Sequence, residues 1–289
     1  MKNKGLPIIF VLDMDKCIIG NSEYILNYEY LINDYILNNC KNKKINSEIC
    51  KISKDLWKQY EYPHYIRPFL KEFIFNIKKI FKYVEFFIFS FGNKEYVENT
   101  IEYVEEKIDF KFNRPLFTRD DGIRKIDNSY IKEINGFQEM IMNSIKSKYS
   151  KLDIEEIFNN RLIIIDDIKK FWDNPHLIEC NPYSYTPIPY LDYSFLNLLR
   201  TNIDILNYIK NSNNKLLPNY LVSSTSHDDF FLNYHLYTSE LIRKNIETNN
   251  EAIKDEFFKN LLKELKSRSK LKKPFTNKFI EDVNKKMIK

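Results

Sequence analysis

Three short apolar segments each run directly into side chains that can bind a metal ion or a phosphate. The segments are Ile8–Leu12, Phe86–Phe89 and Leu162–Ile165, and the polar residues that follow them are Asp13, Asp15, Ser90, Asp166 and Asp167. Carboxylates gathered in one place repel each other, and a divalent cation is the usual compensation. Because the ligands are all oxygen atoms, the set predicts a Mg²⁺ site that keeps positions open for a phosphate.

The same residue types could carry out phosphoryl transfer. A free aspartate can attack phosphorus and form an aspartyl-phosphate. A second carboxyl group can protonate the leaving oxygen and later activate water. A lysine and a hydroxyl would neutralise the phosphoryl oxygens, and a helix expected to begin at Asn93 would direct its free N–H groups at the phosphate.

The elements that must position these residues belong to an α/β fold. The three segments consist of consecutive β-branched and aromatic residues, as strands do when both faces of a parallel sheet are buried. Apolar residues at a spacing of three to four predict helices over 67–81 and 93–107, the second with Asn93 as its N-cap. Alternating strands and helices indicate a doubly wound parallel sheet. The carboxyl ends of its strands would bring the five polar residues to one edge.

The length of 289 residues allows one large domain or a core with an appendage. We expect the catalytic core over residues 1–195, with helical insertions near 22–62 and 135–160, and a helical C-terminal region of unknown role over 196–289. Residues 251–289 hold 12 basic and 6 acidic side chains. A solvated helix surface and a contact for an acidic partner both explain this excess, and we favour the solvated surface.

Composition argues against several other classes of protein. With five glycines, the chain has neither a G-x-x-x-x-G-K-[ST] loop nor a G-x-G-x-x-G motif, which argues against nucleotide-loop enzymes. The four cysteines lack C-x-x-C spacing, so a zinc knuckle is not expected. No apolar run reaches the roughly 18 residues of a membrane span. We therefore expect reduced thiols, a nuclear or cytoplasmic protein, no membrane partner and no indicated nucleic-acid partner.

The order of several motifs resembles that of one enzyme family. Asp13-Met14-Asp15-Lys16-Cys17 is similar to the D-x-D-x-T/V signature of haloacid-dehalogenase (HAD) superfamily phosphatases. More narrowly, the chain resembles the RNA polymerase II C-terminal-domain phosphatases and their small relatives. The further segments that carry this likeness are Arg67–Phe73, Ser90–Gly92 with Tyr96, Tyr130–Ile134, Asp166–Asp167 with Trp172, Asn174–Ile178 and Pro182–Tyr183. The likeness covers about residues 6–190 in family order.

The resemblance implies a role for each carboxylate. Asp13 would be the nucleophile and a Mg²⁺ ligand. Asp15 would be the general acid/base and would offer its backbone carbonyl to the metal. Asp167 would be a metal ligand, and Asp166 either a further ligand or the anchor of a lysine. Cys17 departs from the family by replacing the usual Thr.

The resemblance also implies which groups hold the phosphate. Ser90 and Lys132 would bind the phosphoryl oxygens. Lys125 is the alternative lysine, because the position of this group varies between subfamilies, and the Tyr130–Ile134 context favours Lys132.

Together these observations predict a Mg²⁺-dependent phosphatase for phosphoserine or phosphothreonine in a protein or peptide substrate. The RNA polymerase II C-terminal domain is one candidate substrate. Two alternatives are a HAD phosphatase for a small metabolite or a nucleic-acid end, and a non-catalytic scaffold that keeps the fold. The presence of both D-x-D carboxylates favours the enzyme.

Overall fold

The computed structural model describes residues 5–22, 64–121, 123–126, 129–132, 134–172, 174–186, 226–271 and 273–287. The chain forms two compact units. The first comprises Met1–Gly20, Ile66–Tyr183 and Ile253–Lys289, and the second comprises Asn21–Tyr65 and Ser184–Ala252. The first unit contains every element discussed below except one helix.

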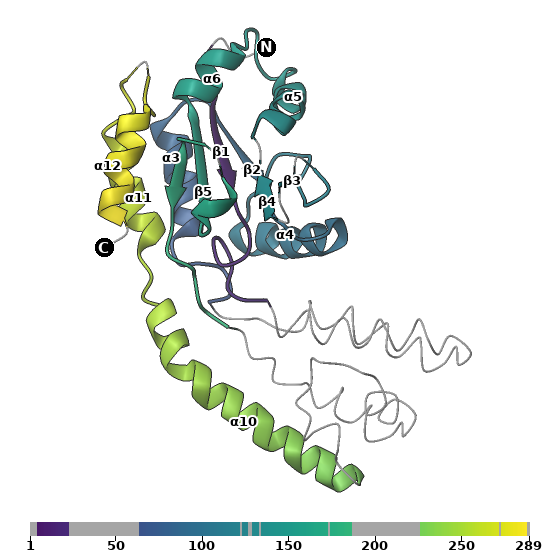
Figure 1. Cartoon of the computed structure of the whole chain (residues 1–289). Coiled ribbons are helices and arrows are strands. Elements are labelled where there is room, and N and C mark those ends of the chain that lie inside the picture. Colours follow the sequence, from purple (N-terminus) through teal and green to yellow (C-terminus); the bar gives the residue numbers. More distant parts are fainter. Residues whose placement is uncertain are drawn as a thin grey trace, which may run out of the picture. The chain divides into compact units, whose positions relative to one another are not determined.

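A four-stranded parallel sheet forms the centre of the first unit (Figure 1). Its strands are β1 (Ile8–Leu12), β2 (Val84–Ile88), β5 (Leu162–Asp166) and β6 (Leu177–Glu179), in the order β2-β1-β5-β6. All residues of β1 and β5 are buried, which confirms the prediction of strands covered on both faces. In the register of the sheet, Leu12 lies opposite both Ile88 and Ile165, so these three strands end side by side.

One face of the sheet is covered by α3 (Leu70–Ile80), α11 (Phe257–Lys266) and α12 (Asn277–Met287) (Figure 1). Phe10 of β1 points to this side, where its ring stacks on Phe86 at 4.9 Å between centroids and meets the edge of Phe73 at 5.8 Å. Phe258 of α11 packs against the same Phe73. Aromatic side chains therefore join β1, α3 and the C-terminal segment.

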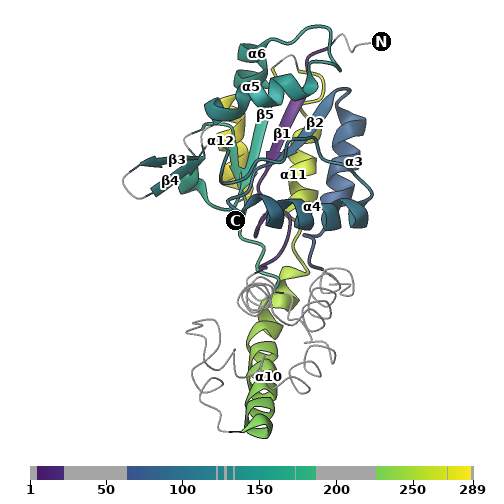
Figure 2. The same ribbon diagram turned by 90° about the vertical axis from the view of Figure 1, so that its right-hand side faces the viewer.

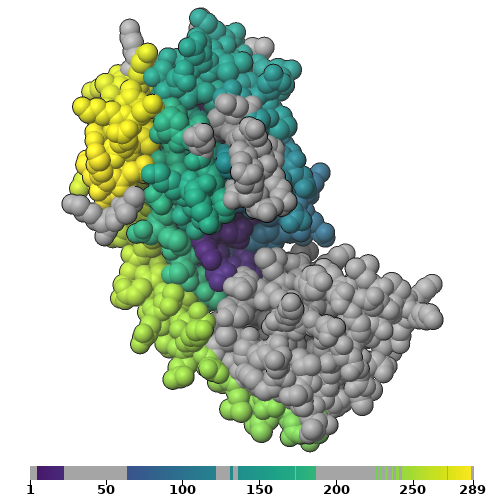
Figure 3. Space-filling model, viewed as in Figure 1, coloured from purple at the N-terminus to yellow at the C-terminus, as the bar shows by residue number. Residues whose placement is uncertain are grey.

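The C-terminal segment 253–287 is part of the unit that contains the sheet. The amphipathic helix α11 buries Phe257, Phe258, Leu261 and Leu265, and α12 lies against the edge strand β6. Asn284 of α12 pairs with that strand: its Nδ2 donates to Leu177 O, and its Oδ1 accepts from Glu179 N. In the space-filling view, the yellow C-terminal residues adjoin teal and green residues from the middle of the sequence (Figure 3).

The opposite face is covered by α5 (Ile134–Ile145) and α6 (Ile154–Asn160), within the range where the sequence predicts a helical insertion. Side chains of these helices, including Phe137 and Ile141, form one buried cluster with Ile9, Val11 and Ile164 of the sheet. The other predicted insertion, 22–62, lies outside the described residues, apart from Ser22. The same is true of the predicted core boundary at residue 195.

Helix α4 (Lys94–Ile108) begins one residue after the predicted cap. The side chain of Asn93 accepts a hydrogen bond from Tyr96 N, which confirms the predicted N-cap. Gly92 precedes it, and a Cβ atom there would lie 2.6 Å from the Tyr96 ring and 2.9 Å from Val97. Only glycine therefore lets this turn pass close to the first turn of α4.

A two-stranded antiparallel hairpin, β3 (Ile123–Ile126) and β4 (Ser129–Lys132), is separate from the main sheet (Figure 2). A short 3₁₀-helix over Lys169–Phe171 follows β5, and Trp172 then forms a parallel bridge with Lys132. The hairpin and the bridge bring Lys132 to the carboxyl end of the sheet.

The second unit contributes helix α10 (His227–Ala252) to the described residues. None of the helices in the described part of the chain is both long enough and apolar enough to cross a membrane.

Candidate active site

The D-x-D loop follows β1 and is tied to the neighbouring strand. Asp13 N donates to Ile165 O at 2.9 Å, and the amides of Cys17, Ile18 and Ile19 all converge on Met14 O. The resulting tight turn includes a left-handed conformation at Lys16, with φ 57°. The carboxylate of Asp13 is buried at the end of the strand, where the α/β architecture places ligand sites.

Lys132 joins two of the aspartates predicted from the sequence. Its Nζ lies 2.5 Å from Asp13 Oδ1 and 2.7 Å from Asp166 Oδ2, and only 1% of the residue is exposed. The rings of Phe89, Phe91 and Trp172 surround the ammonium, with centroids 4.9–5.4 Å away. The lysine is therefore held in place by two charges and three rings.

Asp166 has both of its oxygens engaged by protein donors. Oδ2 accepts from Lys132 Nζ and from Trp172 Nε1 at 2.7 Å, and Oδ1 accepts from the Ile168 amide at 2.7 Å. Of the two roles that the sequence leaves open for Asp166, this geometry favours the anchor of the lysine. Trp172 acts here as a wall of the core that also orients the carboxylate.

Three carboxylates are close enough to hold one cation. Oxygens of Asp13, Asp166 and Asp167 all lie within 4.8 Å of one another. Burial, and next the charge of Asp166, raise the pKa of Asp13 well above its ordinary value, although Lys132 opposes this. Burial and the charge of Asp166 likewise raise the pKa of Asp167 to about 6. A cation bound between the two carboxylates would oppose this effect of burial, and their oxygen donors suit Mg²⁺.

Asp15 is oriented by hydroxyl groups from the next strand end and helix. Tyr96 OH donates to its Oδ1 at 2.5 Å, and Ser90 Oγ donates to its Oδ2 at 3.4 Å. The hydroxyl of Ser90 in turn accepts from the Gly92 amide at 3.0 Å. Ser90 is buried, and its hydroxyl contacts Asp15, the candidate for the general acid/base.

These residues surround a cavity of about 740 Å³ at the carboxyl end of the sheet. Its lining residues are Asp13, Asp15, Lys16, Phe91, Arg119, Asp120, Lys132, Asp166, Asp167, Ile168 and Phe171. Five of them are acidic and three are basic, so the cavity carries a formal charge of −2. A divalent cation would neutralise this charge and allow a phosphate to enter.

Five of the six site residues predicted from the sequence thus line this cavity. The sixth, Ser90, is not a lining residue but contacts Asp15, which is one. Their roles remain predictions. The alternative lysine, Lys125, is on β3, but its side chain lies outside the described ones.

The lining residues that were not predicted for the site include Arg119, Phe91 and Phe171. The two rings meet edge to face at 4.7 Å between centroids, and Arg119 is exposed at the cavity. Phe91 lies in the Ser90–Gly92 motif, so its position beside Ser90 could have indicated that it lies near the site. Phe171 lies at a variable position between Asp167 and Trp172, and Arg119 lies in a segment for which the sequence showed no motif.

Cys17 stands on the D-x-D loop where the family usually has Thr. Its buried Sγ donates to Ile165 O at 3.5 Å, and Cys180 Sγ approaches it at 3.8 Å. Burial raises the pKa of the Cys17 thiol well above its ordinary value, so the group remains a neutral thiol. Its contact with the Ile165 carbonyl is one that a hydroxyl could also make.

Comparison with known proteins decides the family. Residues 8–213 match the family model of the NLI interacting factor-like phosphatases. The chain belongs to this family. Its membership confirms the resemblance to HAD-superfamily C-terminal-domain phosphatases, and the parallel sheet confirms the predicted α/β class.

Three solved structures are similar to this member of the NLI interacting factor-like phosphatases. Fcp1, described as an essential RNA polymerase II CTD phosphatase, is 17% identical over 76% of this chain and 55% of its own, with a TM-score of 0.32. A fission yeast Fcp1 variant bound to beryllium fluoride is 16% identical over 85% and 65%, with a TM-score of 0.34. The HAD domain of effector protein Lem4 from Legionella pneumophila is 13% identical over 69% and 97%, with a TM-score of 0.30. This family member thus spans less than two thirds of either Fcp1 chain. No curated protein matches it.

Proposed function

We propose that the chain is a Mg²⁺-dependent phosphatase for phosphoserine or phosphothreonine in proteins, acting through an aspartyl-phosphate on Asp13. The observation that carries the proposal is the cavity in which Asp13, Asp15, Lys132 and Asp167 converge at the carboxyl end of a parallel sheet. The family match supports the reaction class.

The proposed chemistry assigns one step to each side chain. Lys132 contacts Asp13 Oδ1, so we assign attack on phosphorus to Asp13 Oδ2. Asp15, oriented by Tyr96, would protonate the leaving oxygen and then accept a proton from the attacking water. Lys132 would neutralise phosphoryl charge while Asp166 keeps the ammonium in place.

The metal would be held by Asp13, by Asp167 and by the backbone carbonyl of Asp15. When bound, Mg²⁺ supplies positive charge that offsets the crowded carboxylates and the phosphoryl oxygens. The raised pKa values of Asp13 and Asp167 support this assignment, because a cation bound beside both groups would favour their charged forms.

The substrate assignment rests on the form of the cavity and on the family. Phe91, Phe171 and Ile168 give the cavity an apolar side, and Arg119 adds a positive charge. In a peptide with an apolar residue beside its phosphoserine, the apolar residue would suit the apolar side of the cavity and the phosphate would suit the charge of Arg119. The RNA polymerase II C-terminal domain is one candidate of this kind, and the protein would then act in the nucleus or the cytoplasm.

Turnover of a phosphopeptide panel with Mg²⁺ and with EDTA tests the proposal, with Asp13→Asn as the inactive control. We expect Mg²⁺-dependent phosphate release from the wild type alone. Hydrolysis of small phosphate esters or nucleic-acid ends without hydrolysis of any phosphopeptide would favour the metabolite or end-processing alternative. Inactivity toward every substrate would favour a non-catalytic scaffold.

A further inference from the structure

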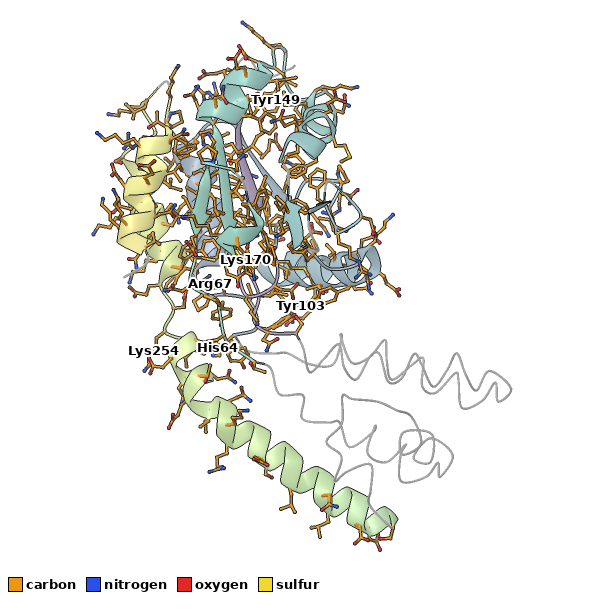
Figure 4. The ribbon with its side chains drawn as sticks, viewed as in Figure 1. His64, Arg67, Tyr103, Tyr149, Lys170 and Lys254 are labelled. Atoms are coloured by element: carbon orange, nitrogen blue, oxygen red, sulfur yellow. The ribbon has the colours of Figure 1, made fainter. Side chains whose placement is uncertain are left out.

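Arg67 is a buried guanidinium that reaches the D-x-D loop. It is 1% exposed, and its Nη1 donates to Cys17 O at 3.2 Å, two residues after Asp15. Its backbone amide donates to Ile18 O at 2.9 Å. Arg67 therefore contacts two consecutive peptide carbonyls of the loop, so it fixes the direction of both peptide groups. Figure 4 places it near the carboxyl ends of the strands, at the opposite end of the sheet from Tyr149.

The same guanidinium is held by a carboxylate from the far end of the chain. Arg67 Nε lies 2.9 Å from Asp255 Oδ1, and Nη2 lies 2.8 Å from Oδ2, which is a two-point ion pair. Nη2 also donates to Asn181 O at 3.0 Å, and the ring of Phe257 covers the group at 4.6 Å. A buried charge that loses its partner is strongly unfavourable, so the position of Arg67 depends on Asp255.

Asp255 lies outside the family match, which ends at residue 213. It lies two residues before the start of α11, where its Oδ1 accepts from the Phe257 amide at 3.0 Å, and that helix packs on α3. The carboxylate thus connects a helix packed on the sheet with the loop that carries both D-x-D aspartates. The neighbouring Tyr183 amide donates to Lys16 O at 2.6 Å, so the loop carbonyls from Lys16 to Ile18 are all bound from outside the loop.

We propose that Asp255 is a positioning residue for the catalytic loop and acts on it through Arg67. The C-terminal segment then contributes to turnover although it lies outside the family match. For the catalytic readout, this inference rests on the proposed phosphatase function. A misplacement of about 1 Å at the reacting groups lowers a rate by roughly a hundredfold, so even a small shift of the loop is measurable.

The test compares Asp255→Asn and Asp255→Glu with a matched control, Glu264→Gln. Glu264 also forms an ion pair within the C-terminal segment, 2.7 Å from Lys286, and among the described residues its hydrogen bonds join it to Ser267 and Lys286, both in that segment. We expect Asp255→Asn to lower kcat for p-nitrophenyl phosphate about ten- to a hundredfold with a much smaller change in KM. Asp255→Glu, which keeps the charge, should recover part of the loss, and Glu264→Gln should behave like the wild type.

A second measurement does not depend on activity. Hydrogen exchange of the amides of Cys17, Ile18 and Ile19, followed by mass spectrometry at a temperature where each variant is folded, should be faster in Asp255→Asn than in Glu264→Gln. Unchanged kcat and unchanged exchange in folded Asp255→Asn would overturn the inference. If the wild type hydrolyses no phosphate ester, the proposed function fails, whereas the exchange rates still decide the role of Asp255.

Discussion

Replacing Lys132 with Met tests the electrostatic arrangement of the site. Methionine keeps the length and apolar body of the side chain among Phe89, Phe91 and Trp172, but it removes the ammonium. That ammonium lies 2.5 Å from Asp13 and 2.7 Å from Asp166, and all three groups are buried. The variant therefore leaves two neighbouring carboxylates without their shared cation.

The expected magnitude follows from this burial. Removing one partner of a buried ion pair costs about 3–5 kcal/mol of unfolding free energy, because the other charge remains desolvated. The cost should depend on pH. The pKa of Asp13 is already raised by burial and by Asp166, and Lys132 is the group that opposes the rise. In the variant, the folded state binds more protons than the unfolded state, so stability is retained at acid pH and decreases as pH rises.

Urea unfolding in EDTA at pH 5.5 and pH 8 measures this difference. Lys148→Met is the control: Lys148 lies 2.7 Å from Glu85, but its side chain is 46% exposed, and Glu85 keeps Tyr149 and Asn113 as partners. We expect the control to lose less than about 1 kcal/mol at either pH. A loss in Lys132→Met that equals the control and does not change with pH would refute the placement of the ammonium between Asp13 and Asp166.

Three further predictions concern the remaining groups. Asp15→Asn should still form a phospho-enzyme from p-nitrophenyl phosphate but hardly from a phosphoserine peptide, because only the serine leaving group needs a proton; equal loss with both substrates, seen by intact mass, would contradict the acid/base role. Tyr96→Phe removes the 2.5 Å hydrogen bond to Asp15 and should lower kcat for a phosphopeptide about tenfold. An unchanged kcat would show that Tyr96 does not orient the general acid. Burial lowers the pKa of His176, so the unfolded state binds more protons and the free energy of unfolding falls as pH decreases below about 6.5. His176→Gln should weaken this pH dependence by up to about 1.4 kcal/mol per pH unit. Identical pH dependence of urea unfolding in both proteins would show that His176 does not cause it.

The edge that carries the chemistry could be predicted from local sequence. The segments Ile8–Leu12 and Leu162–Ile165 have the composition of doubly buried strands, and they form β1 and most of β5. Parallel pairing then places the residues after each strand at the same edge, so Asp13, Ser90 and Asp166 could be expected there. This success rests on the short-range link between strand composition, burial and chain direction.

Pairings across long stretches of sequence could not be predicted in the same way. Asp255 and Arg67 are 188 residues apart. The apolar spacing of α11 indicates a buried face, but it does not identify the surface of the sheet that this face covers. Similarly, the Asp166-Asp167 pair reads as two equal carboxylates in the sequence. The donors Lys132, Trp172 and Ile168 distinguish them, and these converge only in the folded chain.

The phosphoryl acceptor is the group that most directly defines the reaction. The decisive measurement is peptide mapping by mass spectrometry after brief mixing of Mg²⁺-loaded protein with p-nitrophenyl phosphate and an acid quench. The proposed function predicts one added phosphoryl group on the peptide that contains Asp13, and none in folded, Mg²⁺-loaded Asp13→Asn. Phosphate release by the wild type with a label on another residue, or with equal labelling of Asp13→Asn, would contradict the assignment of Asp13 as nucleophile.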